Sequence, residues 1–263
     1  MRSVARARLM HPTERFSSRV ESYVRYRPSY PLAAIELLAE RCGLSAASVA
    51  ADLGSGTGIL TEQLLATGAQ VYAVEPNDGM RAAAEAHLGG HSRFVSVKGT
   101  AEATTLPPSS VDLLVAGQAF HWFDVPRARA EALRIVRRGG CGALLWNERP
   151  VEADAFLADL EGVLLEHAAE YAKITASRAN EASMRAFFGG ALELATFANQ
   201  QRLDFEGLKG RLMSSSYAPE PGHPRHAPMI AALHRVFDRH QRNGEIVYPY
   251  RSLVYFAPLQ RGA

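Results

Sequence analysis

The sequence predicts an α/β protein with a doubly wound, mostly parallel sheet of seven strands and a helical insertion in its C-terminal half. An apolar run at Val49–Asp52 leads into three alternating glycines, and helical periodicity follows over Ile59–Ala66. A second apolar run, Gln70–Glu75, ends in an acid. Short apolar runs then alternate with amphipathic segments as far as Trp146, which is the pattern of strand–helix–strand units.

Composition narrows the possible functions. The chain has 263 residues, of which 47% are hydrophobic and 21% charged, as expected for one globular α/β domain with an insertion. A net charge of +2 provides no general attraction toward nucleic acid. No apolar run reaches the ~18 residues of a membrane span. We therefore expect a cytoplasmic protein that acts on neither nucleic acid nor membranes.

The N-terminus and the cysteines add two expectations. Residues 1–10 are basic but lack the apolar core of a secretory signal, and their arginines leave a transit peptide open beside a simple frayed tail. Cys42 and Cys141 form neither a CxxC pair nor a zinc spacing. We expect reduced thiols and no metal.

The first half of the chain divides into alternating helices and strands. Pro31 suits the first position of a helix over Leu32–Leu44, which Gly43 terminates. Further predicted elements are a helix from Asn77 to Gly89–Gly90, strands at Phe94–Lys98, Val111–Ala116 and Cys141–Trp146, and a helix over Arg127–Arg138.

After Pro150 this alternation stops. Residues 151–190 suggest two or more helices where one would suffice, which indicates an insertion or lid. A sixth strand is expected within Ala191–Leu203, a turn-rich loop at Ser214–Pro224, a helix over Met229–Arg242, and an antiparallel edge strand over Tyr248–Leu259 with Pro249 at its start. The resulting division is an N-terminal segment (1–31), a core (32–149), a lid (150–192) and a C-terminal part that completes the sheet (193–263).

The glycine loop distinguishes three kinds of nucleotide site. A dinucleotide fingerprint would need a third glycine at Ile59, and a phosphate-binding P-loop would need a lysine that this segment lacks. What remains is Asp52-x-Gly54-x-Gly56-x-Gly58. This pattern resembles the first motif of class I S-adenosylmethionine-dependent methyltransferases. The resemblance implies a Rossmann-like fold, S-adenosylmethionine as cofactor with S-adenosylhomocysteine as product, and cofactor contacts from Asp52, Gly54, Ser55, Gly56 and Gly58.

Glu75 is a second, independent signal for the cofactor. It lies 21 positions after Gly54, where an acid at the tip of the neighbouring strand can accept hydrogen bonds from both ribose hydroxyls. Its alternative role is a solvated carboxylate at a strand end. The resemblance adds Pro76, Met80, Ala101, Glu102, Gln118 and Ala119 to the expected cofactor site, with Met80 either against the adenine or in the core.

The segment after the fourth strand, Gln118-Ala-Phe-His-Trp-Phe-Asp124, lacks the Asn/Asp-Pro-Pro-aromatic tetrad of enzymes that methylate base nitrogens. It resembles instead the trans-aconitate methyltransferase-like group with small-molecule substrates, as do the tyrosine- and proline-rich segment at residues 23–31 and the Ser-Ser-Tyr-x-Pro loop. The residues expected to contact the acceptor are Tyr23, Tyr26, Arg27, Trp122, Trp146 and Tyr217. Tyr26 and Arg27 either close over an anionic group or only anchor the first helix.

His121 is the candidate general base, because its unperturbed pKa is ~6.5. A histidine that only fixes the loop is the alternative. The predicted function is methyl transfer to a small molecule, foremost O-methylation of a carboxylate or hydroxyl, by a monomer or homodimer. C-methylation of a quinone-like or isoprenoid substrate, and a non-catalytic cofactor-binding subunit, are the competing hypotheses.

Overall fold

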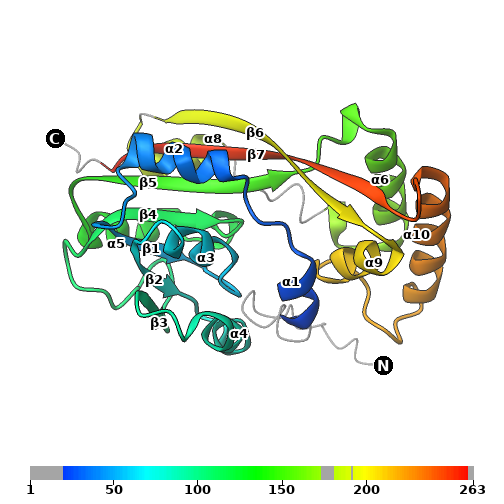
Figure 1. Ribbon diagram of the computed structural model, residues 1–263, viewed down its shortest axis with the longest axis horizontal. Coiled ribbons are helices and arrows are strands. Elements are labelled where there is room, and N and C mark those ends of the chain that lie inside the picture. The colour runs from blue at the N-terminus through cyan, green and yellow to red at the C-terminus, as the bar shows by residue number, and fades with distance from the viewer. Residues whose placement is uncertain (1–19, 173–180, 191, 260–263) are drawn as a thin grey trace, which may run out of the picture.

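The computed structural model describes residues 20–172, 181–190 and 192–259, and its centre is one seven-stranded sheet. The strand order is β3-β2-β1-β4-β5-β7-β6 (Figure 1). Pairs among β1 to β5 are parallel, whereas β7 runs antiparallel to both β5 and β6, so the predicted doubly wound, mostly parallel sheet is confirmed. The strands are β1 (Val49–Leu53), β2 (Gln70–Val74), β3 (Phe94–Val97), β4 (Val111–Gly117), β5 (Val136–Glu148), β6 (Glu193–Leu203) and β7 (Ile246–Pro258).

Helices cover both faces of the sheet because strand side chains alternate between them. In β5, Leu145 packs with α2 and α3 on one face, whereas Leu144 and Trp146 pack with α5 and α8 on the other. The helices are α1 (Val20–Tyr26), α2 (Leu32–Cys42), α3 (Ile59–Leu65), α4 (Asp78–Leu88), α5 (Val125–Ile135), α6 (Ala155–His167), α8 (Glu181–Phe188), α9 (Phe205–Met213) and α10 (His226–His240), with 3-10 turns at Phe120–Trp122 and Val151–Ala153.

A separate hydrophobic cluster lies beside the sheet. It joins α6, α9 and α10 to the far halves of β6 and β7, which extend out of the core toward these helices (Figure 1). α8, by contrast, packs against α5 through Met184, Phe187 and Phe188. The helices after residue 150 are therefore divided differently from the predicted single insertion at 150–192. α6 belongs with α9 and α10, and α8 covers the sheet.

Two predicted elements require correction. The helix expected over Arg127–Arg138 begins at Val125, where the Asp124 side chain caps it, and ends at Ile135 because the next residues join β5. The last strand was expected at an edge, but β7 lies between β5 and β6. β6 forms the edge instead, and Pro249 pairs with Gln200 of β6 beyond the part of β7 that pairs with β5.

The two cysteines are also placed differently from the expectation of reduced thiols. Cys42 at the end of α2 and Cys141 in β5 form a disulfide, at a sequence separation of 99. No local spacing could have indicated this pair, since α2 reaches β5 only by packing over the sheet.

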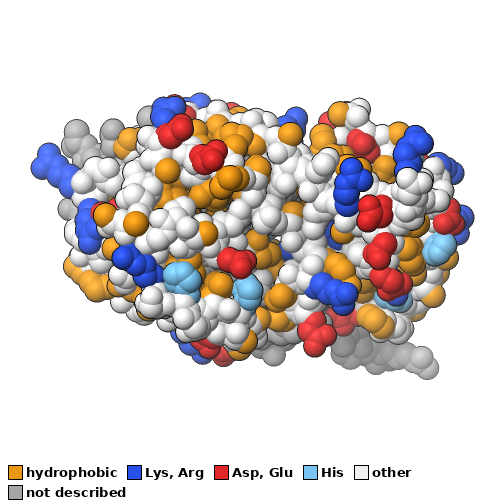
Figure 2. Space-filling view, viewed as in Figure 1, with side chains coloured by type: hydrophobic (Ala, Val, Ile, Leu, Met, Phe, Trp, Pro, Cys, Tyr) orange, Lys and Arg blue, Asp and Glu red, His pale blue; other side chains and the backbone are white. Residues whose placement is uncertain are grey.

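The distribution of charged side chains on the surface agrees with the nearly balanced charge of the sequence (Figure 2). Acidic and basic side chains are interspersed on the face shown in Figure 2, without one extended basic patch. Within the described ranges, no helix is long and apolar enough to cross a membrane, and no cluster of three metal-ligating side chains occurs. The expected N-terminal tail falls on residues 1–19, which lie outside the described residues.

Candidate active site

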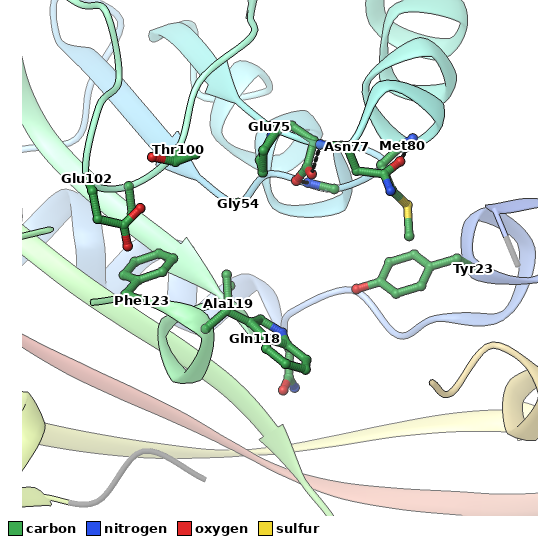
Figure 3. Close-up of a pocket in the computed structure, with 15 residues that line it drawn as sticks. Tyr23, Gly54, Glu75, Asn77, Met80, Thr100, Glu102, Gln118, Ala119 and Phe123 are labelled. Carbon is green, nitrogen blue, oxygen red and sulfur yellow. Dashed lines mark hydrogen bonds between the residues drawn. The ribbon is translucent and has the colours of Figure 1, made fainter. Parts of the chain in front are cut away.

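A cavity opens at the carboxyl ends of β1, β2 and β4, which is where open parallel sheets bind ligands (Figure 3). Its volume of about 320 Å³ lies within the range of small-molecule binding sites. Its walls come from the glycine loop, the start of α4, the loop after β3 and the loop after β4. The lining residues are Tyr23, Gly54, Gly56, Glu75, Pro76, Asn77, Met80, Thr100, Ala101, Glu102, Gly117, Gln118, Ala119, Trp122 and Phe123.

The glycine loop requires glycine for two physical reasons. Gly54 has φ of +68°, and a Cβ there would lie 2.6 Å from the Ala119 Cβ. Gly58 has φ of +90° at the start of α3, and its Cβ would meet Leu88 at 2.7 Å. Gly54 and Gly56 line the cavity, whereas Gly58 acts behind it by admitting α4 against the loop.

Glu75 is fixed at the tip of β2 by two backbone donors. Its Oε2 accepts from the Gly56 N–H at 2.9 Å and its Oε1 from the Asn77 N–H at 2.8 Å, as the dashed lines in Figure 3 show. Burial raises its pKa, and these two hydrogen bonds oppose the rise. Each carboxylate oxygen keeps capacity to accept one more hydrogen bond, which is what a ribose diol requires.

The part of the cavity beside Glu75 suits a flat aromatic base. The Met80 side chain points into the cavity, and Asn77 caps α4 by accepting from the Met80 N–H at 2.9 Å (Figure 3). Ala101 and Glu102 form the neighbouring wall. One oxygen of Glu102 accepts from the Asp124 N–H at 2.8 Å, which ties the loop after β3 to the start of α5.

A second, smaller cavity adjoins the first and shares Tyr23, Gly54, Gly117 and Gln118 with it. Its other lining residues are Arg27, Pro28, Tyr30, Asp52, Ser55, Ile59, Leu60, Asn147 and Arg211. Asp52 accepts from the Thr61 hydroxyl at 2.7 Å through Oδ2. Burial raises the pKa of Asp52 to about 7, although the bond from Thr61 opposes the rise.

The polar atoms here fit the amino-acid end of S-adenosylmethionine. Three buried side-chain oxygens have no hydrogen-bond partner among the described residues, namely Asp52 Oδ1, Ser55 Oγ and Thr57 Oγ1. Buried polar atoms are rarely left unpaired unless a ligand or water completes them. Of these residues, Asp52 and Ser55 line the second cavity, where a carboxylate acceptor and a hydroxyl match an ammonium and a carboxylate, and Glu75 in the adjoining cavity matches a ribose.

Comparison with known proteins agrees with this geometry. Residues 51–144 match the family model described as "Methyltransferase domain". An uncharacterized methyltransferase of Mycobacterium tuberculosis is 42% identical over 134 residues, which make up 51% of this chain and 52% of that protein. Over this central segment the chain is therefore similar to methyltransferases.

More distant proteins share the domain and its fold. A protein of Saccharomyces cerevisiae named as a probable S-adenosylmethionine-dependent methyltransferase is 28% identical over 138 residues, 50% of this chain and 46% of its own length. The chain thus spans about half the length of the curated relatives it matches. A methyltransferase-type structure from Anabaena variabilis superposes with a TM-score of 0.62 at 22% identity, covering 89% of this chain and 98% of its own. That likeness shows the fold.

The loop after β4 lies at the junction of the two cavities, since Gly117 and Gln118 line both. Gln118 has φ of +58°, and its Nε2 donates to the Asn147 carbonyl at 3.2 Å. Trp122 and Phe123 line the main cavity, as the sequence indicates. His121 sits in the same turn with its ring against Trp122, but it is not among the residues that line either cavity.

Three predicted acceptor-binding residues lie elsewhere than on these two cavity walls. Trp146 faces the sheet core and packs edge-on against Phe120 and Tyr255, because β5 continues to Glu148 and Trp146 alternates inward. Tyr26 packs on Gly210 of α9, in agreement with an anchoring role. Tyr217 lines a small buried cavity near α9. Tyr23 and Arg27 do line the ligand cavities.

Several lining residues were not predicted from the sequence. Asn77 and Thr100 border residues that were predicted, so the resemblance could have included them. Three of them lie far along the chain from the glycine loop, at the end of β5, just after it and in α9, namely Asn147, Arg149 and Arg211. No local pattern connects these positions with the cofactor motif.

Proposed function

We propose that this protein transfers the methyl group of S-adenosylmethionine to a small-molecule acceptor, foremost to an oxygen of a carboxylate or hydroxyl. The observation that carries the proposal is the pair of adjoining cavities that meet at Gly54, Gly117 and Gln118. The first has the groups for a ribose and a base, and the second is lined by charged and phenolic side chains. A cofactor held in the first would direct its methyl group toward the junction.

The chain's residues would contribute chiefly binding and alignment. The cofactor, when bound, supplies a methyl group already activated by the sulfonium charge. Glu75 would hold the ribose and Met80 the adenine, while Asp52 and Ser55 would fix the amino-acid end. Aligning two reactants in a site closed to water supplies most of the rate of such a displacement. Trp122 and Phe123 shield the main cavity, and their π faces favour a nearby cation.

The need for a base depends on the acceptor. A carboxylate is ionised at neutral pH and needs none, so His121 would then only hold the turn that carries Trp122. Its place outside both cavity walls supports this positional role. We further propose that α6, α9 and α10 form the lid over the acceptor side, in the manner of the trans-aconitate methyltransferase-like group. A monomer or homodimer acting in the cytoplasm is consistent with a site built from one chain.

C-methylation of a quinone-like or isoprenoid compound is the second candidate, because carbon acceptors require a base and Tyr30 and Tyr23 line the junction. A bell-shaped pH–rate profile with loss of turnover in His121→Ala would favour it. The third candidate, a cofactor-binding subunit without turnover, would bind S-adenosylhomocysteine but release no product with any acceptor.

Transfer from methyl-labelled S-adenosylmethionine to panels of small carboxylic acids, phenols and isoprenoid diphosphates tests the proposal. Label that becomes volatile after mild alkali identifies a methyl ester, since ethers and C-methyl groups resist that treatment. Stable label in phenols or isoprenoids would move the assignment to the corresponding class. Cofactor binding without transfer to any panel would favour the non-catalytic subunit.

A further inference from the structure

Two arginines line the second cavity, one buried and one partly buried. Arg211 of α9 is 9% exposed and lines this cavity together with Arg27. It also lines a small buried cavity on its other side, with Arg149, Ser215, Tyr217 and Tyr248. Arg211 is therefore the side chain that connects the cofactor's neighbourhood with the helices of the lid.

The hydrogen-bond partners of Arg211 and Arg27 are all neutral. Arg211 donates from Nε to the Tyr250 hydroxyl at 2.9 Å and from Nη1 to the Ser215 hydroxyl at 3.5 Å. Arg27 donates from Nη2 to the Ser214 carbonyl at 2.9 Å, and its buried Nε has no partner among the described residues. Within the described part of the chain, neither guanidinium forms an ion pair.

Two carboxylates lie near these arginines without pairing with them. Asp52 lines the second cavity and accepts from the Thr61 hydroxyl, and it forms no ion pair with a described residue, while Glu161 is engaged by Arg149. Arg149 donates to Glu161 at 3.2 Å, and the Tyr171 hydroxyl bonds to the same carboxylate. Among the described residues, the buried guanidinium of Arg211 and the partly buried one of Arg27 thus have no ion-pair partner. Burying an unpaired charge is costly, so such groups are retained where an anion completes them.

The pKa shifts of neighbouring groups also indicate a positive electrostatic potential at this place. Burial alone would raise the pKa of Tyr217, yet the guanidinium groups of Arg149 and Arg211 bring it below its usual range. Burial lowers the pKa of Arg27, and repulsion from Arg211 lowers it further. Arg27 and Arg211 are thus close enough to repel each other, and an anion between or beside them would relieve that repulsion.

We infer that Arg211, supported by Arg149 and Tyr217, forms a subsite for an anionic group of the methyl acceptor. This inference rests on the proposed methyltransferase function and specifies its substrate. The acceptor would be a small molecule that carries a carboxylate or phosphate group. Arg211 is then the residue that selects the acceptor, because a guanidinium fork pairs with the oxygens of such groups.

The two unpaired arginines would serve different molecules. Arg27 lies next to α1 and lines the second cavity with Ser55 and Asp52, beside the expected amino-acid end of the cofactor. Arg211 alone reaches the second and the small buried cavity. We therefore assign the cofactor carboxylate to Arg27 and the acceptor anion to Arg211. The tyrosine rings of Tyr248 and Tyr250 lie at 5.7 and 5.8 Å from the Arg211 guanidinium and hold it by cation–π contact.

Calorimetric titrations of the full chain, saturated with S-adenosylhomocysteine, test the assignment. The probes are succinate, its neutral diamide and inorganic phosphate. The proteins are wild type, Arg211→Met, Arg211→Lys and the matched control Arg235→Met, which removes an exposed arginine of α10. We expect wild type and the control to bind succinate but not the diamide. Arg211→Met should weaken that binding by about tenfold or more, the scale of a lost charged hydrogen bond. Arg211→Lys, which keeps the charge but not the fork, should be intermediate.

A separate readout distinguishes a binding role from a structural one. The melting temperature of ligand-free Arg211→Met should equal or exceed that of wild type, since the variant removes an uncompensated buried charge. Saturable binding of phosphate but not succinate, lost in Arg211→Met, would keep the anion subsite and assign it to a phosphorylated acceptor. Equal binding of succinate and the diamide, no response to either anion, or anion binding unchanged in Arg211→Met would overturn the inference.

Cofactor affinity separates this inference from the proposed function. Affinity for S-adenosylhomocysteine should be the same in wild type and all Arg211 variants. A selective loss of that affinity in Arg211→Met would assign Arg211 to the cofactor and overturn the acceptor subsite. A wild type that binds no S-adenosylhomocysteine would refute the proposed function itself, regardless of whether it binds succinate or phosphate.

Discussion

Asp52→Asn should remove a pH dependence of cofactor binding that the buried carboxylate creates. Asp52 is 1% exposed, accepts one hydrogen bond from Thr61, and has a second oxygen without a partner among the described residues. Burial raises its pKa to about 7, and the neighbouring Glu75 carboxylate adds to the rise. An ammonium group on the cofactor would bind the ionised form of Asp52.

The size of the effect follows from the titration. With a pKa of about 7, Asp52 is roughly one-tenth ionised at pH 6 and nine-tenths at pH 8. The affinity of wild type for S-adenosylhomocysteine should therefore rise about tenfold over this range. The folding stability of the ligand-free protein should change with pH in the opposite direction. The folded state holds the proton more tightly than the unfolded state, so stability falls as pH rises from about 4 to 7, by on the order of 4 kcal/mol.

Calorimetry at several pH values on wild type and Asp52→Asn provides the assay, with chemical denaturation at pH 5 and pH 8 alongside. The variant should bind more weakly at pH 8, and any slope that remains reports Glu75, whose pKa burial also raises. The free energy of unfolding of the variant minus that of wild type should also be larger at pH 8 than at pH 5. An unchanged pH slope in Asp52→Asn would refute the assignment of this carboxylate.

Three further predictions concern neighbouring residues. Gly54→Ala should reduce cofactor affinity by about tenfold or more in a titration, because its Cβ would lie 2.6 Å from Ala119 and its φ is +68°; affinity like that of wild type would contradict the close packing. Arg27→Gln should weaken binding of S-adenosylhomocysteine but not of methylthioadenosine, which lacks the carboxylate, and equal losses for both would dismiss the carboxylate role. His121→Ala should change kcat by no more than a few-fold for a carboxylate acceptor, with an unaltered pH–rate profile; total loss of turnover would instead make it the base.

The cofactor side of the molecule could be predicted from the sequence because its determinants are local. The loop at Gly54–Gly58 needs positive φ angles and close contacts that only glycine allows, so the pattern itself records the geometry. Glu75 follows at a separation fixed by one helix and one strand. The parallel order of β1 to β5 follows from the alternation of strands and helices.

The acceptor side could not be predicted in the same way. Arg211 meets Arg27 and Arg149 only after α9 folds against the end of the sheet, and no spacing in the sequence records that contact. Trp146 was expected at the cavity because the strand was predicted to end there. Since β5 continues for two more residues, the Trp146 side chain lies in the core instead. The inner position of β7 likewise depends on β6 adding outside it.

Calorimetric titration with S-adenosylhomocysteine, on wild type and on Glu75→Ala, tests the central claim most directly. Glu75 lies at the tip of β2 with both oxygens held by backbone N–H groups and free capacity toward the cavity. We expect wild type to bind, and the variant to bind about tenfold or more weakly, as for a lost pair of charged hydrogen bonds. A folded wild type that binds no S-adenosylhomocysteine would contradict the claim that this cavity is a methyltransferase cofactor site.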